Sequence, residues 1–207
     1  MLKAKTAAVV GLGGLGGHIA EQLARIGIGN LILIDGDKYS ESNLNRQLFA
    51  AENTLGKYKV EAAAERLAAV NPNTELVIHA EYLTAQNSAG ILSNADIVAD
   101  GTDNKTSKLL LEKICAGLNI TLAYGSCEGF FGRAALVMPS DGTVSKLYGG
   151  AAKETAAVTT LAFTAAATAS VQTAEIVKYL LGRPVTLSGK VLCMDLSSHE
   201  YKTISLK

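Results

Sequence analysis

The sequence contains no tryptophan, and only three prolines and three cysteines among its 207 residues. The cysteines, Cys115, Cys127 and Cys193, lie far apart, and no two of them form a CxxC pair. They cannot form a four-cysteine zinc site, and we predict that the protein binds no zinc. An odd number of isolated cysteines without a signal peptide is typical of a reduced, cytoplasmic protein.

The chain also lacks an excess of charge of either sign. Its 19 basic and 19 acidic residues argue against a broad basic surface for nucleic acid or for an anionic membrane. The uncharged stretch at residues 155–174 is long enough to span a bilayer, but it consists mostly of alanine and threonine. We interpret it as part of a soluble domain, in a helix packed closely on a sheet or on another subunit, and we predict neither nucleic acid nor membrane as a partner.

A glycine-rich turn follows the first apolar run, at residues 7–10. A helical pattern comes next, and a second apolar run, at residues 31–34, ends at Asp35. This order is typical of a dinucleotide-type fold, in which backbone N–H groups at a helix N-terminus approach a phosphate and the acid binds a ribose hydroxyl. The sequence therefore predicts nucleotide binding at four glycines, Gly11, Gly13, Gly14 and Gly16. A turn that merely packs a helix close to a sheet would explain the glycines alone.

Apolar runs and helical patterns alternate along the first 124 residues. This alternation predicts one α/β domain over residues 1–207, with a Rossmann-like, mostly parallel sheet, helices on both faces and an antiparallel C-terminal extension. Expected strands lie at residues 5–10, 31–34, 76–78, 95–100 and 120–124. A glycine-punctuated loop should follow, then strands at 133–138 and 143–147 around a turn, a helix ending near residue 181, and a hairpin at 191–196 and 202–206.

The block Ser42-Asn43-Leu44-Asn45-Arg46-Gln47, with Gly56-Lys57-Tyr58-Lys59 after it, is more specific than the glycine turn. Together with Asp35, Asp37 and the later Asp100-Gly101-Thr102-Asp103-Asn104, it closely resembles the ThiF/MoeB/HesA family, the bacterial relatives of ubiquitin-activating enzymes. The resemblance covers nearly the whole chain. It implies a protein that adenylates the C-terminus of a small ubiquitin-like protein.

Adenylation builds negative charge on phosphates, so its site needs cations and a metal in fixed positions. Arg46 offers a planar fork for phosphate oxygens, Lys59 a point charge, and Asp103 a carboxylate for Mg²⁺. The resemblance implies the same three roles at these positions. It also implies that Asp35 holds the ribose, and that three further residues line the nucleotide pocket, namely Ser42, Asn43 and Asn104.

The chain departs from the family pattern in three respects. It lacks the two zinc-binding CxxC pairs of many relatives, and residues 145–170 contain no cysteine for a covalent carrier–enzyme step. It also offers only Lys3 and Lys5 before its first strand, where better-known members carry an arginine that reaches the neighbouring subunit's ATP site. Arg25 or Arg133 could supply such a cation instead. Cys127 is expected on the loop after the fifth strand, as a small buried residue.

These observations predict an ATP- and Mg²⁺-dependent adenylyltransferase that acts on the C-terminal glycine of a small ubiquitin-like sulfur-carrier protein. The pathway would be thiamine, molybdopterin or related sulfur transfer, and the family suggests a homodimer. One alternative is a non-catalytic relative that binds a nucleotide or a ubiquitin-like protein. Another is an NAD-dependent oxidoreductase, which would leave Arg46 and Lys59 unexplained.

Overall fold

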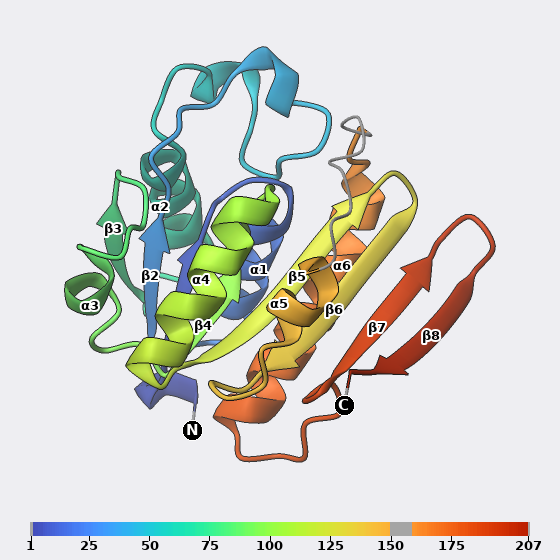
Figure 1. Ribbon diagram of the computed structural model, residues 1–207. Helices are drawn as coiled ribbons and strands as arrows, with labels where there is room; N and C mark the ends of the chain where they lie inside the picture. The colour runs from blue at the N-terminus through green and yellow to red at the C-terminus, as the bar shows by residue number, and fades with distance from the viewer. Residues whose placement is uncertain (1, 150–158, 207) are drawn as a thin grey trace.

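An eight-stranded sheet forms the centre of the protein in a computed structural model, which describes residues 2–149 and 159–206 (Figure 1). Its strands are β1 (Thr6–Val10), β2 (Asn30–Ile34), β3 (Glu75–His79), β4 (Ile97–Asp100), β5 (Thr121–Glu128), β6 (Phe131–Val137), β7 (Lys190–Asp195) and β8 (Glu200–Ser205). The α-helices are α1 (Gly14–Arg25), α2 (Lys59–Val70), α3 (Ser88–Ile91), α4 (Lys105–Leu118), α5 (Thr143–Tyr148) and α6 (Ala162–Leu180). Short 3₁₀ helices occur at Leu2–Ala4, Glu41–Asn43 and Glu52–Thr54.

The strand order is β3-β2-β1-β4-β5-β6-β7-β8. The first five strands in this order are parallel, and β6, β7 and β8 are added antiparallel. The chain changes direction across the sheet between β1 and β4, which is where such folds bind ligands. The predicted fold, a Rossmann-like sheet with an antiparallel extension, is confirmed.

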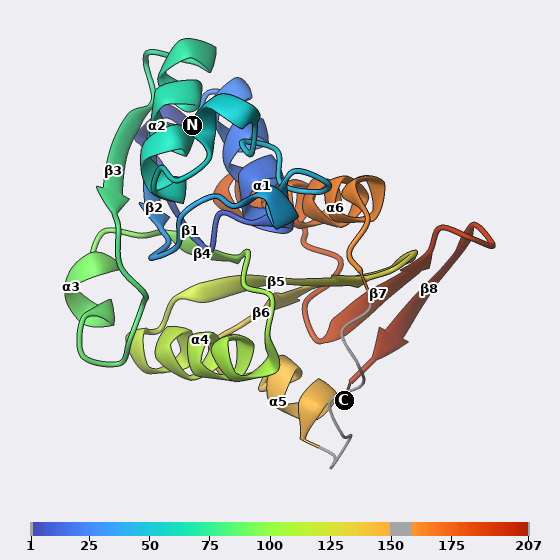
Figure 2. The same ribbon diagram turned by 90° about the horizontal axis from the view of Figure 1, so that it is seen from above.

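Helices cover both faces of the sheet, as Figure 2 shows from above. Side chains of a strand alternate between the two faces, so Ala7 and Val9 of β1 pack towards α1, α2 and α6, whereas Ala8 and Val10 pack towards α3, α4 and α5. Burial on both faces accounts for the unbroken apolar runs of the central strands.

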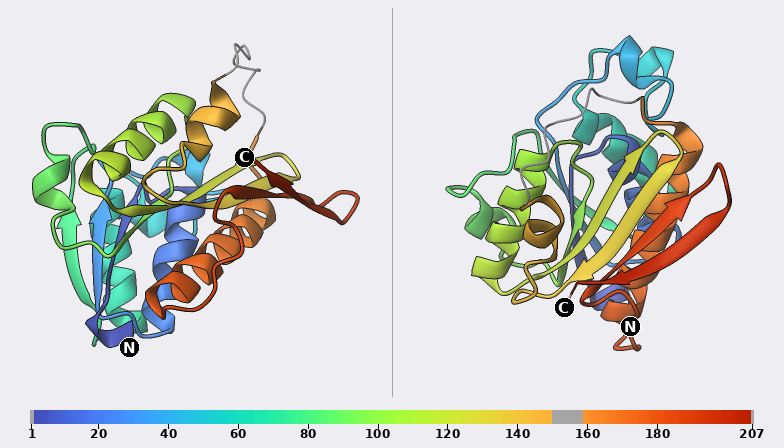
Figure 3. Two further views of the ribbon diagram at one scale, coloured as in Figure 1. Left: turned by 60° about the horizontal axis from the view of Figure 1, so that its bottom comes forward. Right: turned by 45° about the vertical axis from the view of Figure 1, so that its right-hand side comes forward.

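The antiparallel extension is covered less. Every residue of the edge strand β8 is exposed, and Figure 3 shows the β7–β8 hairpin projecting beyond the helices. The extension therefore adds exposed surface beside the buried central strands of the parallel half.

Two sequence-based expectations about this region are wrong. Residues 143–147 form helix α5 rather than a strand, and the buried carboxylate of Glu112 on α4 accepts hydrogen bonds from the backbone N–H groups of Val144 and Ser145 at its start. The glycine-punctuated loop is instead the continuation of β5 to Glu128 and its hairpin with β6. Gly125 is part of this strand, and the Gln172 side chain of α6 occupies the space where a Cβ atom at Gly125 would lie.

Helix α6 contains most of the uncharged stretch at residues 155–174, of which 155–158 lie outside the described residues. It packs against α1, β5 and β6, with Thr164, Ala165, Thr168 and Ala169 buried. No helix within residues 2–149 and 159–206 has the length and hydropathy needed to cross a lipid bilayer.

Candidate nucleotide site

Three loops meet at the carboxyl ends of β1, β2 and β4. Val10 is in register with both Ile34 and Asp100, so the residues that follow these strands lie next to one another. Backbone hydrogen bonds join them, because Gly11 N–H donates to the Ile34 carbonyl and Gly101 N–H to the Val10 carbonyl, each at 2.8 Å. The sheet register thus brings together the glycine turn, Asp35 and the Asp100–Asn104 segment.

The glycine turn is packed so tightly against its surroundings that a side chain cannot be accommodated at Gly16 or at the neighbouring Gly101. A Cβ atom at Gly16 would overlap the carbonyl oxygen of Gly11, and one at Gly101 would overlap the same oxygen. Gly11 itself has φ 84°, a conformation that favours glycine. Gly16 is therefore needed for packing rather than as a lining residue, whereas Gly11 lines the cavity described below.

Helix α1 begins at Gly14 with Gly13 as its N-cap residue. Gly13 has no side-chain oxygen to accept the first N–H groups of the helix, and both Gly13 and Gly14 line the cavity. Backbone donors and the positive end of the helix dipole therefore face the cavity, an arrangement suited to a phosphate.

Asp35, 7% exposed, first shapes its own loop. Its Oδ2 accepts the Leu12 N–H at 2.6 Å and its Oδ1 accepts the Asp37 N–H at 2.8 Å. Burial raises the pKa of Asp35, although these hydrogen bonds and the Lys59 charge act in the opposite direction. Each carboxylate oxygen can accept a second hydrogen bond, so a ribose hydroxyl can still be bound here.

Lys59 begins α2, and its buried ammonium group lies among carboxylates. Its Nζ is 2.9 Å from Asp37 Oδ2 and 3.9 Å from Asp35 Oδ2. The hydroxyl of Tyr82 donates a short hydrogen bond to the other oxygen of Asp37, and the Tyr82 ring packs against Gly36. Tyr82 and Asp37 thus hold Lys59 beside Asp35, a connection that the sequence did not reveal.

Arg46 lines the cavity from the loop at residues 36–56. Its Nη1 donates to the Ser42 carbonyl and to Asn45 Oδ1, both at 2.8 Å. Asn43 is buried and its Oδ1 accepts the Ser40 N–H. Ser42 and Asn43 do not line the cavity, in contrast to their predicted place in the pocket, and instead shape the loop that carries Arg46.

Asp103 and Asn104 follow β4 and both line the cavity. Asn104 is the N-cap of α4, since its Oδ1 accepts the Ser107 N–H at 2.8 Å, and its amide nitrogen donates to Asp103 at 3.2 Å. The exposed Asp103 carboxylate is therefore held by its neighbour. Within residues 2–149 and 159–206, no group of three or more His, Cys, Asp and Glu is placed to hold a metal ion.

Two residues that the sequence analysis did not assign to the site, Lys108 and Gln172, support it from below. Lys108 is buried, and its Nζ donates to Asp100 Oδ2, to the Thr102 carbonyl and to the Gly125 carbonyl at 3.0, 2.7 and 2.6 Å. The amide nitrogen of Gln172 donates to the carbonyls of Asp100 and Ala123. These contacts tie α4 and α6 to the ends of β4 and β5. A lysine within a helix and a glutamine in an alanine-rich stretch carry no sequence signal for this role.

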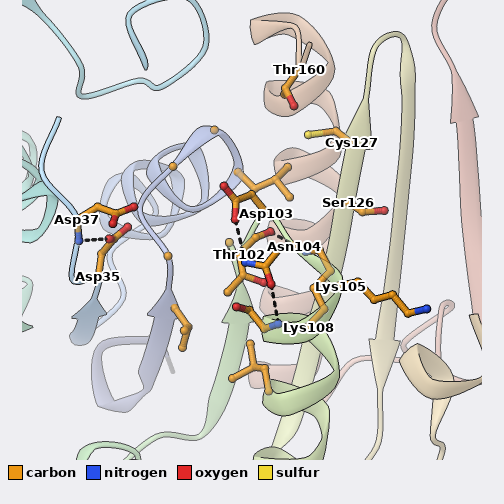
Figure 4. Close-up of a pocket in the computed structure, with 18 of the residues that line it drawn as sticks. Asp35, Asp37, Thr102, Asp103, Asn104, Lys105, Lys108, Ser126, Cys127 and Thr160 are labelled. Carbon is orange, nitrogen blue, oxygen red and sulfur yellow. Dashed lines mark hydrogen bonds between the residues drawn. The ribbon is translucent and has the colours of Figure 1, made fainter. Parts of the chain in front are cut away.

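Cys127 requires a correction, because it lies within β5 rather than on a loop, and it is half-buried at the cavity wall. Figure 4 shows its side chain extending towards Thr160, whereas Ser126 extends to the other side of the strand. Burial raises the pKa of the Cys127 thiol, against the opposing charges of Lys108 and Arg46. The thiol is therefore not activated as a thiolate.

All these loops enclose one cavity of about 1170 Å³. Its lining changes along its length, with glycines, Arg46 and Gln47 at the α1 end and mainly apolar side chains, including Ile34, Leu83 and Ile114, between β2 and α4. A third part lies against the β5–β6 hairpin, where Ser126, Phe131 and Arg133 line it. The combination of a phosphate-type end and an apolar slot suits a purine nucleotide.

Comparison with known proteins agrees with this geometry. The ThiF family profile matches residues 1–207. The chain is 30% identical over 210 residues to the molybdopterin-synthase adenylyltransferase of Escherichia coli K12, covering 99% of this chain and 84% of that protein. It is 31% identical over 212 residues to the adenylyltransferase and sulfurtransferase MOCS3 of Drosophila sechellia, covering all of this chain and 47% of MOCS3. The chain thus spans about half the length of that relative.

Solved structures show the same fold. The crystal structure of Escherichia coli MccB superposes with a TM-score of 0.85 at 23% identity, over 99% of this chain and 63% of MccB. That of PaaA gives 0.83 at 24% identity, over 99% and 65% of the two chains. Since the family match spans the full length, the chain belongs to the ThiF family.

Proposed function

We propose that this protein is an adenylyltransferase that uses ATP to activate the C-terminal glycine carboxylate of a small ubiquitin-like sulfur-carrier protein. The main support is the arrangement of the glycine turn, Asp35, Arg46, Lys59 and Asp103 around one cavity at the switch point of the sheet. The relatives named as adenylyltransferases support the reaction class. The proposal covers residues 1–207 as one adenylyltransferase domain.

The nucleotide would be held along the cavity. The N–H groups at the start of α1 would bind phosphate oxygens, and Arg46 would add a guanidinium beside them. Asp35 would accept a hydrogen bond from the ribose, and the apolar slot at Ile34 would take the base. Lys59, now 2.9 Å from Asp37, would reach a phosphate by extending from that pair.

A bound Mg²⁺ would neutralise phosphate charge, and Asp103 is the carboxylate that would hold it. One protein carboxylate is enough, because Mg²⁺ commonly takes its other ligands from phosphates and water. The exposed Asp103, steered by Asn104, fits this role.

In the reaction, a carboxylate oxygen of the carrier would bond to the α-phosphorus of ATP while the bond to pyrophosphate breaks, giving an acyl adenylate. The protein's own contribution is positional and electrostatic, since no side chain needs to become covalently attached. The site thus favours adenylation over hydride transfer to NAD, because Arg46 and Lys59 would have no task in hydride transfer.

We further propose that the protein acts as a cytoplasmic homodimer. An exposed aromatic pair supports self-association, because the rings of Phe130 and Phe163 lie 5.2 Å apart on the β5–β6 hairpin and α6, and both side chains are about half exposed. Light scattering at micromolar concentration tests this, and a monomeric mass would contradict it.

Nucleotide binding is tested first by calorimetric titration with Mg²⁺–ATP, with NAD as the competitor ligand. Wild type should bind ATP and not NAD, and Asp35→Ala should lose ATP binding. Asp35→Asn keeps one acceptor oxygen, which can serve only one of the Leu12 and Asp37 N–H groups, so it should weaken ATP binding less than Asp35→Ala does. Binding of NAD alone would favour the oxidoreductase alternative.

Turnover is tested by ATP–pyrophosphate exchange in the presence of candidate carriers. Arg46→Ala and Asp103→Ala should each lower the exchange rate about a hundredfold or more, as expected for the loss of one preorganised charge. Arg183→Ala, an exposed arginine outside the cavity, is the matched control. Full exchange in the Arg46 and Asp103 variants would disprove these roles, and ATP binding without exchange for any carrier would favour a non-catalytic relative.

A further inference from the structure

The hairpin end of the cavity contains a basic site that is separate from the glycine turn. Ser126 of β5 is in register with Arg133 of β6, so their side chains lie on the same face of the sheet, close to one another. Both line the cavity. Neighbouring residues on this face, Tyr124 and Ala135, pack towards α4 and α5. Ser126 extends from β5 on the side opposite to Cys127 and Thr160 (Figure 4), and the register places Arg133 on the same face as Ser126.

Arg133 is available for a ligand. Its half-buried guanidinium stacks over the ring of Phe131 at 5.2 Å and forms no ion pair with another described residue. In contrast, Lys59 and Lys108 in the same cavity are each paired with carboxylates. Glu128 also lines the cavity, but its side chain is exposed and is not among the ion-paired residues of the described chain.

Ser126 lines the cavity, and its hydroxyl accepts a hydrogen bond from Tyr124, which leaves its own hydrogen for another acceptor. The Tyr124 hydroxyl donates to Ser126 Oγ at 3.0 Å, so its oxygen must accept from Tyr148, 2.9 Å away. The three hydroxyl groups thus form a series in which Tyr148 donates to Tyr124 and Tyr124 donates to Ser126. The Ser126 hydroxyl is the last donor of the series. Lys105 lies on the same side, with its Nζ 6.0 Å from the Tyr148 ring centre.

We propose that Arg133, Ser126 and Lys105 form a carboxylate-binding subsite for the tail of the protein substrate. This inference rests on the proposed function, since it assigns to the tail the end of the cavity that the nucleotide does not need. A planar guanidinium beside a hydroxyl donor matches the two oxygens of a carboxylate. The carboxylate belongs either to the C-terminus itself or to an acidic side chain in the tail.

The test uses three short labelled peptides built from serine, alanine and glycine, all ending in Gly-Gly. One has a free C-terminus, the second is amidated, and the third is amidated with a glutamate a few residues before its end. Fluorescence polarisation gives their affinities without ATP for wild type, Arg133→Gln, Arg133→Lys and the control Arg183→Gln. Calorimetry with Mg²⁺–ATP on the same samples reads the nucleotide site independently.

Wild type should bind one of the two carboxylate peptides about tenfold more tightly than the neutral amide, as expected for a charged hydrogen bond, and added salt should reduce this preference. Arg133→Gln should lose the preference, Arg133→Lys should keep part of it, and Arg183→Gln should keep all of it. The peptide that binds more tightly identifies the ligand, which is the C-terminal carboxylate for the first peptide and the glutamate side chain for the third. Equal affinity for all three peptides in wild type, absence of binding, or an unchanged preference in Arg133→Gln would overturn the subsite. Failure of ATP binding with an intact peptide preference would instead count against the proposed function.

Discussion

The parallel half of the sheet and its antiparallel extension contribute to the cavity in different ways. At the ends of β1, β2 and β4, the site includes backbone groups, close glycine contacts and the buried ion pair of Lys108 with Asp100. Along β5 and β6, it consists of side chains that are only half-buried, such as Arg133 and Cys127. We infer that the parallel half would determine how a nucleotide is bound. Side chains of the extension could change, and with them the protein partner, without disturbing the core.

Two lysines illustrate this difference. Lys108 is buried and paired with Asp100, whose side chain is fully buried, whereas Lys202 on β8 pairs with Glu200 and is 71% exposed. Removing one partner of a buried pair leaves an uncompensated charge, but an exposed pair is screened by water and salt. The same substitution should therefore have different consequences in the two regions.

Lys108→Met should produce the largest effect, lowering the free energy of unfolding by about 3–5 kcal/mol, because it leaves Asp100 buried without its cation. Urea denaturation followed by circular dichroism measures this change. The double variant Lys108→Met/Asp100→Asn should lose less than the two single variants combined. Lys202→Met is the control, and a similar loss there would contradict the contrast between the two halves.

Gly16→Ala should come next, lowering the free energy of unfolding by about 3 kcal/mol, since the new methyl group would overlap the Gly11 carbonyl. Thermal unfolding measures the loss. Nucleotide affinity should also fall, because relief of the overlap moves the glycine turn. An unchanged melting temperature would show that the turn can relax without cost.

Glu175→Gln should have an intermediate effect that depends on pH. Burial favours protonation of Glu175, but hydrogen bonds from Lys178 and Thr186 outweigh it and hold the pKa below 4.5. Its charged form therefore stabilises the fold above about pH 4.5, and this contribution is lost as the pH falls through the lowered pKa. The variant should be less stable than wild type by about 1–3 kcal/mol at pH 7.

The difference should shrink as the pH falls below 4.5, which denaturation at a series of pH values can measure. A constant difference at all pH values would show that Glu175 contributes through packing alone. Because Glu175 also accepts the backbone N–H groups of Thr186 and Leu187 before β7, the variant tests the connection between the two halves.

Gly117→Ala should have the smallest effect and the opposite sign. Gly117 lies on the exposed side of α4, and a Cβ atom there would meet nothing within 4 Å. Alanine should stabilise the helix by about 0.5–1 kcal/mol, because the unfolded chain loses conformational freedom. A rise in melting temperature is expected, and a fall would indicate a contact that the described structure does not contain.

The nucleotide end of the site could be predicted from sequence because its signals are local. The glycine turn, Asp35 and Lys59 each stand directly at the end or start of an element, so a pattern of a few residues locates them. Arg46 could be placed through the family block in which it occurs. Their ligand contacts remain predictions.

The missed features depend on partners that are distant in sequence. Residues 143–147 contain Thr143, Val144 and Leu147 and look like a strand, but the carboxylate of Glu112 accepts N–H groups at the start of this segment and favours the helix. Gly125 looks like a strand breaker until the Gln172 side chain is seen beside it. Such tertiary contacts override local propensity, and no sequence window contains them.

The position of Tyr82 has a practical consequence for observing the protein at work. Its ring rests on Gly36 at the edge of the cavity and its hydroxyl is bonded to Asp37, in a chain that has seven tyrosines and no tryptophan. The ultraviolet emission of the protein is therefore free of a tryptophan background. A Tyr82→Trp substitution would place one distinct fluorophore beside Gly36 and Asp37, so that occupancy of the cavity could be followed in real time without labelling either substrate.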